Sequence, residues 1–246
     1  MSQRPDPPNH CRRCGTCCRK GGPALHHADL PLLRDTIILR EALYTLRVGE
    51  PVHDQVKGQV VLLDAECVKV RSKESAVDSS AKSEPGCRFY LPDPSSVPQT
   101  APAKASEHPS ERPTGRCAIH ETKPLECAAL KCWNTAELAR AAATPRLSRL
   151  DILGSDNALA ELIRDHETHC SVANLLSHLQ APTPKSADLL RQATAYDAAL
   201  RDLLQEKAGT PPDHLPFLLG RPLAEVIHGL RRWMANCLNH SKMGSA

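Results

Sequence analysis

The sequence predicts a mainly helical fold of the α+β class, with few strands and a small cysteine-rich module that contains a short β-hairpin. Of the 11 cysteines, nine lie within the first 132 residues, most of them in close groups. Residues 59–71 are rich in β-branched side chains, which is typical of a strand or a hairpin. From residue 134 to the end, apolar side chains recur at helical spacing. We therefore expect a cysteine-rich domain over residues 1–135 and a helical region over residues 136–246.

The first half of the chain contains one expected helix, one strand region and two polar stretches. Asp29 is a suitable N-cap and Gly49 a suitable stop for a helix reaching about Val48. The apolar residues at helical spacing within it are Leu30, Leu33, Ile37, Ile38, Leu43 and Leu46. Residues 72–84 are polar, and residues 94–113 hold five prolines without any Leu, Ile or aromatic side chain. This second stretch cannot bury enough apolar surface to fold, so it is expected to be a disordered insertion.

The second half is expected to consist of helices joined by short loops. Asn134 and Glu137 are suited to cap a helix that reaches about Ala143 and stops before Pro145. Three further helices are expected over residues 156–170, 186–207 and 222–236, each with an apolar stripe on one face.

Composition excludes several classes of function. The net charge is +3 and only 7 residues are aromatic, which disfavours a nucleic-acid partner. No apolar run approaches the roughly 18–20 residues that a membrane span needs. The first nine residues are polar and proline-rich, unlike a secretory signal. These features predict a soluble, cytoplasmic protein with no membrane association.

Cysteine spacing is the most informative feature of the sequence. In a reducing cytosol, closely spaced cysteines indicate metal binding or redox chemistry rather than disulfides. Cys11, Cys14 and Cys17 follow one another at Cys-x2-Cys spacing, which turns neighbouring sulfurs to the same side. A second set of four cysteines, Cys87, Cys117, Cys127 and Cys132, lies downstream. With the first run and its neighbour Cys18, there are eight candidate metal ligands: Cys11, Cys14, Cys17, Cys18, Cys87, Cys117, Cys127 and Cys132.

Eight thiols suit two four-thiolate sites, or one site with additional redox-active or neighbouring thiols. Adjacent residues in extended backbone point in opposite directions, so Cys17 and Cys18 are expected to face apart. The first run would then offer three sulfurs to one site and one to another, and the downstream set would lie close to it. The alternative is two independent sites, one for each set. Since the module has few aromatics and two long polar stretches, we expect the metal to organise its fold.

A few other residues are weaker candidates. His120 stands three residues after Cys117 and could ligate, although capping or packing is the simpler interpretation. His166 and Cys170 lie four residues apart on one expected helix and form a potential metal pair, but a histidine beside a buried thiol is the simpler interpretation. Cys67 and Cys237 are expected to behave as small hydrophobic residues.

The cysteine pattern resembles that of a known family. The segment from Cys11 to Pro23, with its CxxCxxCC run, is similar to the YkgJ-type cysteine-cluster family, as are Gly86-Cys87 and the segment from Cys117 to Cys127. The resemblance covers roughly residues 9–135. It implies a zinc- or iron-chelating domain in which the eight cysteines are the ligands. This chain has His120 where the family usually has Tyr, and its proline-rich insertion is unusual.

Three functions remain open from the sequence. The first is a cytosolic metal-binding protein that holds an iron–sulfur cluster or zinc, and the Cys-x2-Cys-x2-Cys run favours the cluster. The second is an enzyme of methyltransferase-like or redox type that uses the cluster and binds its substrate with the helical region, since flagellin lysine methylases carry a similar cluster. The third is a structural zinc module that binds a protein partner. The sequence identifies no catalytic residue.

Overall fold

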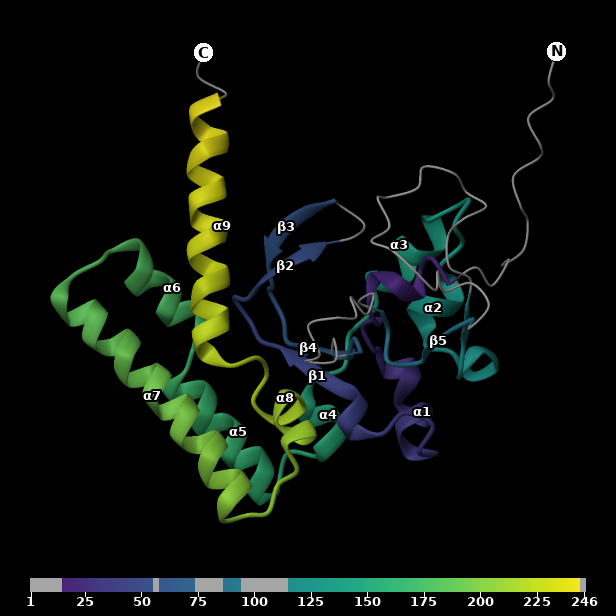
Figure 1. Ribbon diagram of the computed structural model, residues 1–246, viewed down its shortest axis with the longest axis horizontal. Helices are drawn as coiled ribbons and strands as arrows, with labels where there is room; N and C mark the ends of the chain where they lie inside the picture. The colour runs from purple at the N-terminus through teal and green to yellow at the C-terminus, as the bar shows by residue number, and fades with distance from the viewer. Residues whose placement is uncertain (1–14, 55–57, 74–85, 94–114, 244–246) are drawn as a thin grey trace, which may run out of the picture. The chain divides into compact units, whose positions relative to one another are not determined.

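The computed structural model describes residues 15–54, 58–73, 86–93 and 115–243 (Figure 1). Cys11, Cys14 and the expected insertion at 94–113 lie outside the described residues. The fold is mainly helical with three two-stranded sheets among the described residues, which confirms the predicted fold class. None of the described helices is long and apolar enough to cross a membrane.

The chain divides into two compact units, and each is built from two separate segments. Residues 1–38 and 70–145 form the first, here called the cysteine unit. Residues 39–69 and 146–246 form the second, here called the helical unit. This division differs from the expected one at residue 135, because residues 39–69 pack with the C-terminal helices.

The cysteine unit consists of short elements. A 3₁₀ turn over Cys18–Lys20 follows the first cysteines, and α1 spans Leu30–Arg34. Strands β5 (Tyr90–Pro92) and β6 (Gly115–Cys117) pair antiparallel, with Tyr90 opposite Cys117. The helices α2 (Leu125–Ala129) and α3 (Ala136–Ala142) complete the unit, and α3 begins just after Asn134, whose side chain accepts a hydrogen bond from the Ala136 N–H at 2.9 Å.

The predicted helix over residues 29–48 is wrong beyond Arg34. The chain leaves helical geometry at Thr36, whose φ is 57°, and then forms strand β1 over Leu43–Leu46. Leu43 and Leu46 are buried, and the Thr45 hydroxyl donates to the Phe217 carbonyl oxygen at 2.7 Å. Contacts with distant segments therefore outweigh the local helical periodicity.

The strands of the helical unit pair differently from the expected hairpin. The run 59–71 does form strands, β3 (Gln59–Leu62) and β4 (Cys67–Val70). However, β3 pairs antiparallel with β2 (Pro51–Asp54), and β4 pairs with β1. The tight hairpin is thus β2–β3, and it lies in the helical unit instead of the cysteine-rich module.

Helices make up most of the helical unit. In chain order they are α4 (Arg149–Leu153), α5 (Ala158–His169), α6 (Val172–Gln180), α7 (Pro184–Glu206), α8 (Leu215–Leu218) and α9 (Leu223–Met243). The expected helices at 156–170, 186–207 and 222–236 correspond to α5, α7 and α9. Side-chain N-caps start four of the helices, each accepting a backbone N–H: Ser148, Asn157, Ser171 and Thr183.

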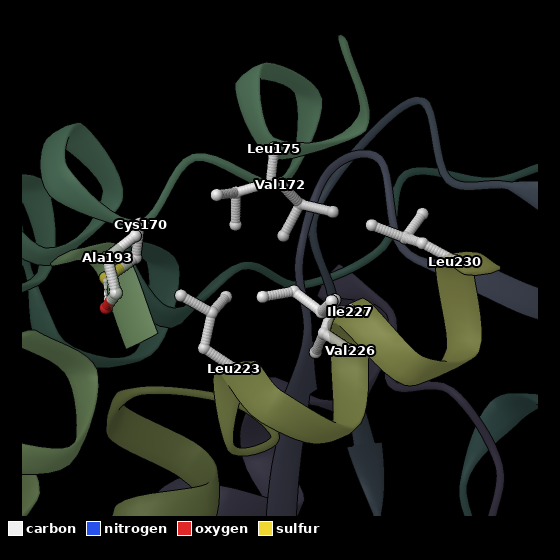
Figure 2. Close-up of a cluster of buried hydrophobic side chains, with 8 residues drawn as sticks. All are labelled: Cys170, Val172, Leu175, Ala193, Leu223, Val226, Ile227 and Leu230. Atoms are coloured by element: carbon white, nitrogen blue, oxygen red, sulfur yellow. Dashed lines mark hydrogen bonds between the residues drawn. The ribbon is translucent and has the colours of Figure 1, made fainter. Parts of the chain in front are cut away.

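The core of this unit lies where α6, α7 and α9 meet (Figure 2). One face of α9 carries four buried side chains at helical spacing, and they point toward Val172 and Leu175. These four are Leu223, Val226, Ile227 and Leu230. Cys170 and Ala193 extend the cluster, so Cys170 packs as a small hydrophobic residue.

Two buried charged groups link the elements of the helical unit. The Arg149 side chain is fully buried and donates to the carboxylates of Glu66 and Glu167 and to the Leu218 carbonyl oxygen. Glu50, also fully buried, accepts hydrogen bonds from Arg47 and from Arg221. The Arg149–Glu66 and Arg221–Glu50 pairs join residues 39–69 to the part of the chain beyond residue 146.

Candidate metal centre

Five cysteines of the cysteine unit lie together. Their thiols interact with one another closely enough to shift each other's pKa values. They come from four segments of the chain, and we call them the thiol cluster: Cys17, Cys18, Cys87, Cys117 and Cys127. The structure thus places the described part of the first run beside three members of the downstream set.

Backbone hydrogen bonds hold the first segments of the cluster in place. The Cys87 N–H donates to the Cys18 carbonyl oxygen at 2.7 Å, which joins the first run directly to the second set. Cys117 ends strand β6 opposite Tyr90, whose side chain is buried. The Tyr90 ring packs so closely on Gly15 that a Cβ there would lie 2.4 Å from it, and Gly15 also has a φ of 71°. Glycine is therefore required at this turn.

Cys17 and Cys18 do not face apart as expected, and their sulfur atoms lie 4.0 Å from each other. The expectation assumed extended backbone, but Cys17 has φ −68° and ψ −39° and leads directly into the 3₁₀ turn. In a helical turn successive side chains diverge by far less than in a strand. Both sulfurs can therefore serve the same centre.

The thiol cluster combines acidified and neutral thiols. Hydrogen bonding from the Cys18 thiol lowers the pKa of Cys17 and of Cys117 to about 6 each. Correspondingly, hydrogen bonding to Cys117 and Cys17 strongly raises the pKa of Cys18. Burial raises the pKa of Cys87 and of Cys127. The arrangement is a proton-sharing group of sulfurs, in which two thiols ionise readily near neutral pH.

The helix that carries Cys127 is anchored by a buried polar network. Glu126, its neighbour on α2, accepts a hydrogen bond from the Ala24 N–H at 2.8 Å and lies 3.2 Å from His26 Nε2. Asp29 accepts hydrogen bonds from the backbone N–H groups of Leu125 and His26. The segment that follows the first cysteine run therefore fixes the start of α2, and with it the position of Cys127.

The remaining predicted ligand in the described residues, Cys132, is exposed. The charge of His120 contributes to the low pKa of Cys117. Among the other cysteines, Cys67 and Cys170 are buried and Cys237 is exposed on α9.

A second group of ligand-type residues lies in the helical unit. His166, Cys170 and Asp197 are buried, with one potential ligand atom of each within 4.8 Å of the others. However, both Asp197 oxygens already accept hydrogen bonds, from His166, from Arg201 and from the Leu223 N–H. A cation here would have to displace the Arg201 guanidinium, so we assign this group to the packing of α5, α7 and α9.

Comparisons with known proteins add no relative. No protein-family model, no curated protein and no solved structure matches this chain.

Proposed function

We propose that the cysteine unit binds a soft or borderline transition metal through the thiol cluster, as an iron–sulfur cluster or as zinc. The observation that carries this proposal is the convergence of five thiols from four segments of one unit. Cysteines that serve only as small apolar residues do not need to form hydrogen bonds with one another.

The donor chemistry fits the proposed metals. Thiolates favour zinc and iron–sulfur clusters over calcium or magnesium, which prefer oxygen ligands. Metal binding requires deprotonated sulfur, and the pKa of about 6 at Cys17 and Cys117 lowers the cost of that step. The charge of Lys123 contributes to the low pKa of Cys17. When bound, zinc would fix the module's fold, whereas an iron–sulfur cluster would add electron transfer.

The sequence gives two further supports. Cys11 and Cys14 precede the thiol cluster at ligand spacing, which would provide additional sulfurs. The resemblance to the YkgJ-type cysteine-cluster family implies the same chemistry.

Anaerobic purification with metal and acid-labile sulfide analysis tests the proposal. We expect a stoichiometric metal that Cys117→Ser lowers and that Cys237→Ser, a change at an exposed cysteine on α9, leaves unchanged. An iron–sulfur protein would be brown and bleached by dithionite, and a zinc protein would be colourless. Absence of stoichiometric metal from the wild-type chain, both as purified and after reconstitution with iron and sulfide or with zinc, would refute the proposal.

A further inference from the structure

We infer that His120 is a ligand of the metal in the thiol cluster, through Nε2. This inference rests on the proposed function and specifies which side chains complete the site.

The state of the His120 imidazole is the first observation. Nε2 is buried and has no hydrogen-bond partner among the described residues. Nδ1 lies 3.2 Å from Glu121 Oε1. If Nδ1 carries the proton and donates it to this carboxylate, Nε2 keeps its lone pair. A ligating histidine in proteins commonly has this arrangement, in which a carboxylate fixes the tautomer and orients the ring.

The position of His120 is the second observation. The residue begins a 3₁₀ turn (His120–Thr122) three residues after Cys117, the same interval as in a Cys-x2-Cys pair. A buried lone pair without a donor is costly unless a ligand meets it, and Cys117 of the thiol cluster stands three residues before His120.

The burial of the His120 ring nitrogen also suits a ligand. His120 has 25% of its side chain exposed, but its Nε2 atom is inaccessible. The site would therefore have a mixed sulfur and nitrogen donor set. Zinc accepts such a set readily, and an iron–sulfur cluster accepts it in a histidine-ligated form.

The test uses the full chain, stripped of metal under anaerobic reducing conditions and titrated with Co²⁺ as a spectroscopic probe. Sulfur-to-cobalt charge-transfer absorption reports binding, and its titration gives the Kd. Three variants are compared: His120→Gln, His120→Cys and, as a matched control at an exposed histidine of the same unit, His27→Gln. X-ray absorption fine structure of the wild-type Co²⁺ complex shows directly whether an imidazole is bound.

We expect imidazole scattering in the wild-type complex. His120→Gln should raise the Kd for Co²⁺ by about 100-fold or more, at or above the range for losing an outer-shell partner. His120→Cys should keep binding and add charge-transfer intensity, because the new thiolate replaces the imidazole. His27→Gln should bind as the wild type does.

Two results would overturn the inference. One is a wild-type complex without imidazole scattering, which decides the question even if His120→Gln fails to fold. The other is an unchanged Kd in His120→Gln. If the wild-type chain bound no Co²⁺ at all, the proposed function itself would be refuted, and the inference with it.

Discussion

Replacing Asp197 with asparagine tests how strongly one buried carboxylate holds three helices together. Asp197 lies on α7 and is 3% exposed. It accepts hydrogen bonds from His166 Nε2 of α5 at 2.8 Å, from Arg201 Nε at 3.0 Å and from the Leu223 N–H at the start of α9 at 2.9 Å. Burial would raise the pKa of this carboxyl, but these donors outweigh it and hold the pKa well below its usual value.

The expected loss follows from these contacts. Asparagine keeps the volume and one acceptor oxygen but removes the negative charge opposite Arg201. Removing one partner of a buried ion pair costs about 3–5 kcal/mol. Arg201 keeps its hydrogen bonds to the carbonyl oxygens of Gly220 and Arg221, which limits the damage. We therefore expect Asp197→Asn to lower the free energy of unfolding by about 3 kcal/mol, at the lower end of that range.

Asp188 provides a matched control on the same helix. It pairs with Arg191, but its side chain is 53% exposed, so Asp188→Asn should change the free energy of unfolding by less than about 1 kcal/mol. Urea denaturation followed by far-UV circular dichroism measures both variants at neutral pH. A loss in Asp197→Asn no larger than that in Asp188→Asn would refute the reasoning.

The same variant has a defined pH dependence. The folded pKa of Asp197 lies below its unfolded value of 3.8, so its stabilising contribution is fully present above that pH. It is lost as the pH falls through the folded pKa, because the carboxyl is then protonated in both states. The difference in unfolding free energy between wild type and Asp197→Asn should therefore be largest near neutral pH and shrink below about pH 4.

Two further predictions concern the cysteine unit. Gly22→Ala should destabilise this unit by about 1–3 kcal/mol, since a Cβ at this position would lie 2.2 Å from the Val70 carbonyl oxygen. We expect faster amide hydrogen exchange in residues 15–38 of the variant. Exchange at the wild-type rate would contradict the prediction. If the cysteine unit holds the metal that we propose, chelation should accelerate exchange in residues 15–38 and 115–133 while α7 and α9 remain protected. Unchanged protection of the cysteine unit after loss of bound metal would show that metal does not organise its fold.

Local patterns in the sequence were sufficient to predict α5, α7 and α9, but not the shorter helices α4, α6 and α8. The residues of α5, α7 and α9 carry an apolar stripe, and α7 and α9 bury that stripe in one shared core. Side-chain caps such as Asn157 and Thr183 mark their starts. Here local propensity and tertiary packing agree, so the periodicity alone places the ends of α5 and α7 and the start of α9 within two residues. The C-terminal end of α9 was missed, since the helix continues from the expected residue 236 to Met243.

The strands and the division into units depend on distant partners that no local pattern reveals. Leu43 and Leu46 have helical spacing with their neighbours, yet they form a strand because β4 and the segment around Phe217 cover them. Likewise, the side-by-side sulfurs of Cys17 and Cys18 depend on a helical turn that the sequence alone did not reveal. The importance of His120 is visible only once the burial of Nε2 is known, although its interval from Cys117 is present in the sequence.

The helical unit is formed by two segments that are far apart in the chain, and this affects its folding during synthesis on the ribosome. The Thr45 hydroxyl and the Phe217 carbonyl are 172 residues apart in the chain, and Glu50 and Arg221 are separated by 171. Strands β1 to β4 thus leave the ribosome long before the helices that cover them exist. During that interval Leu43 and Val68, fully buried in the finished protein, lack their final partners. Contacts of such long sequence separation slow folding, so this nascent segment is where we expect a chaperone to bind while translation continues.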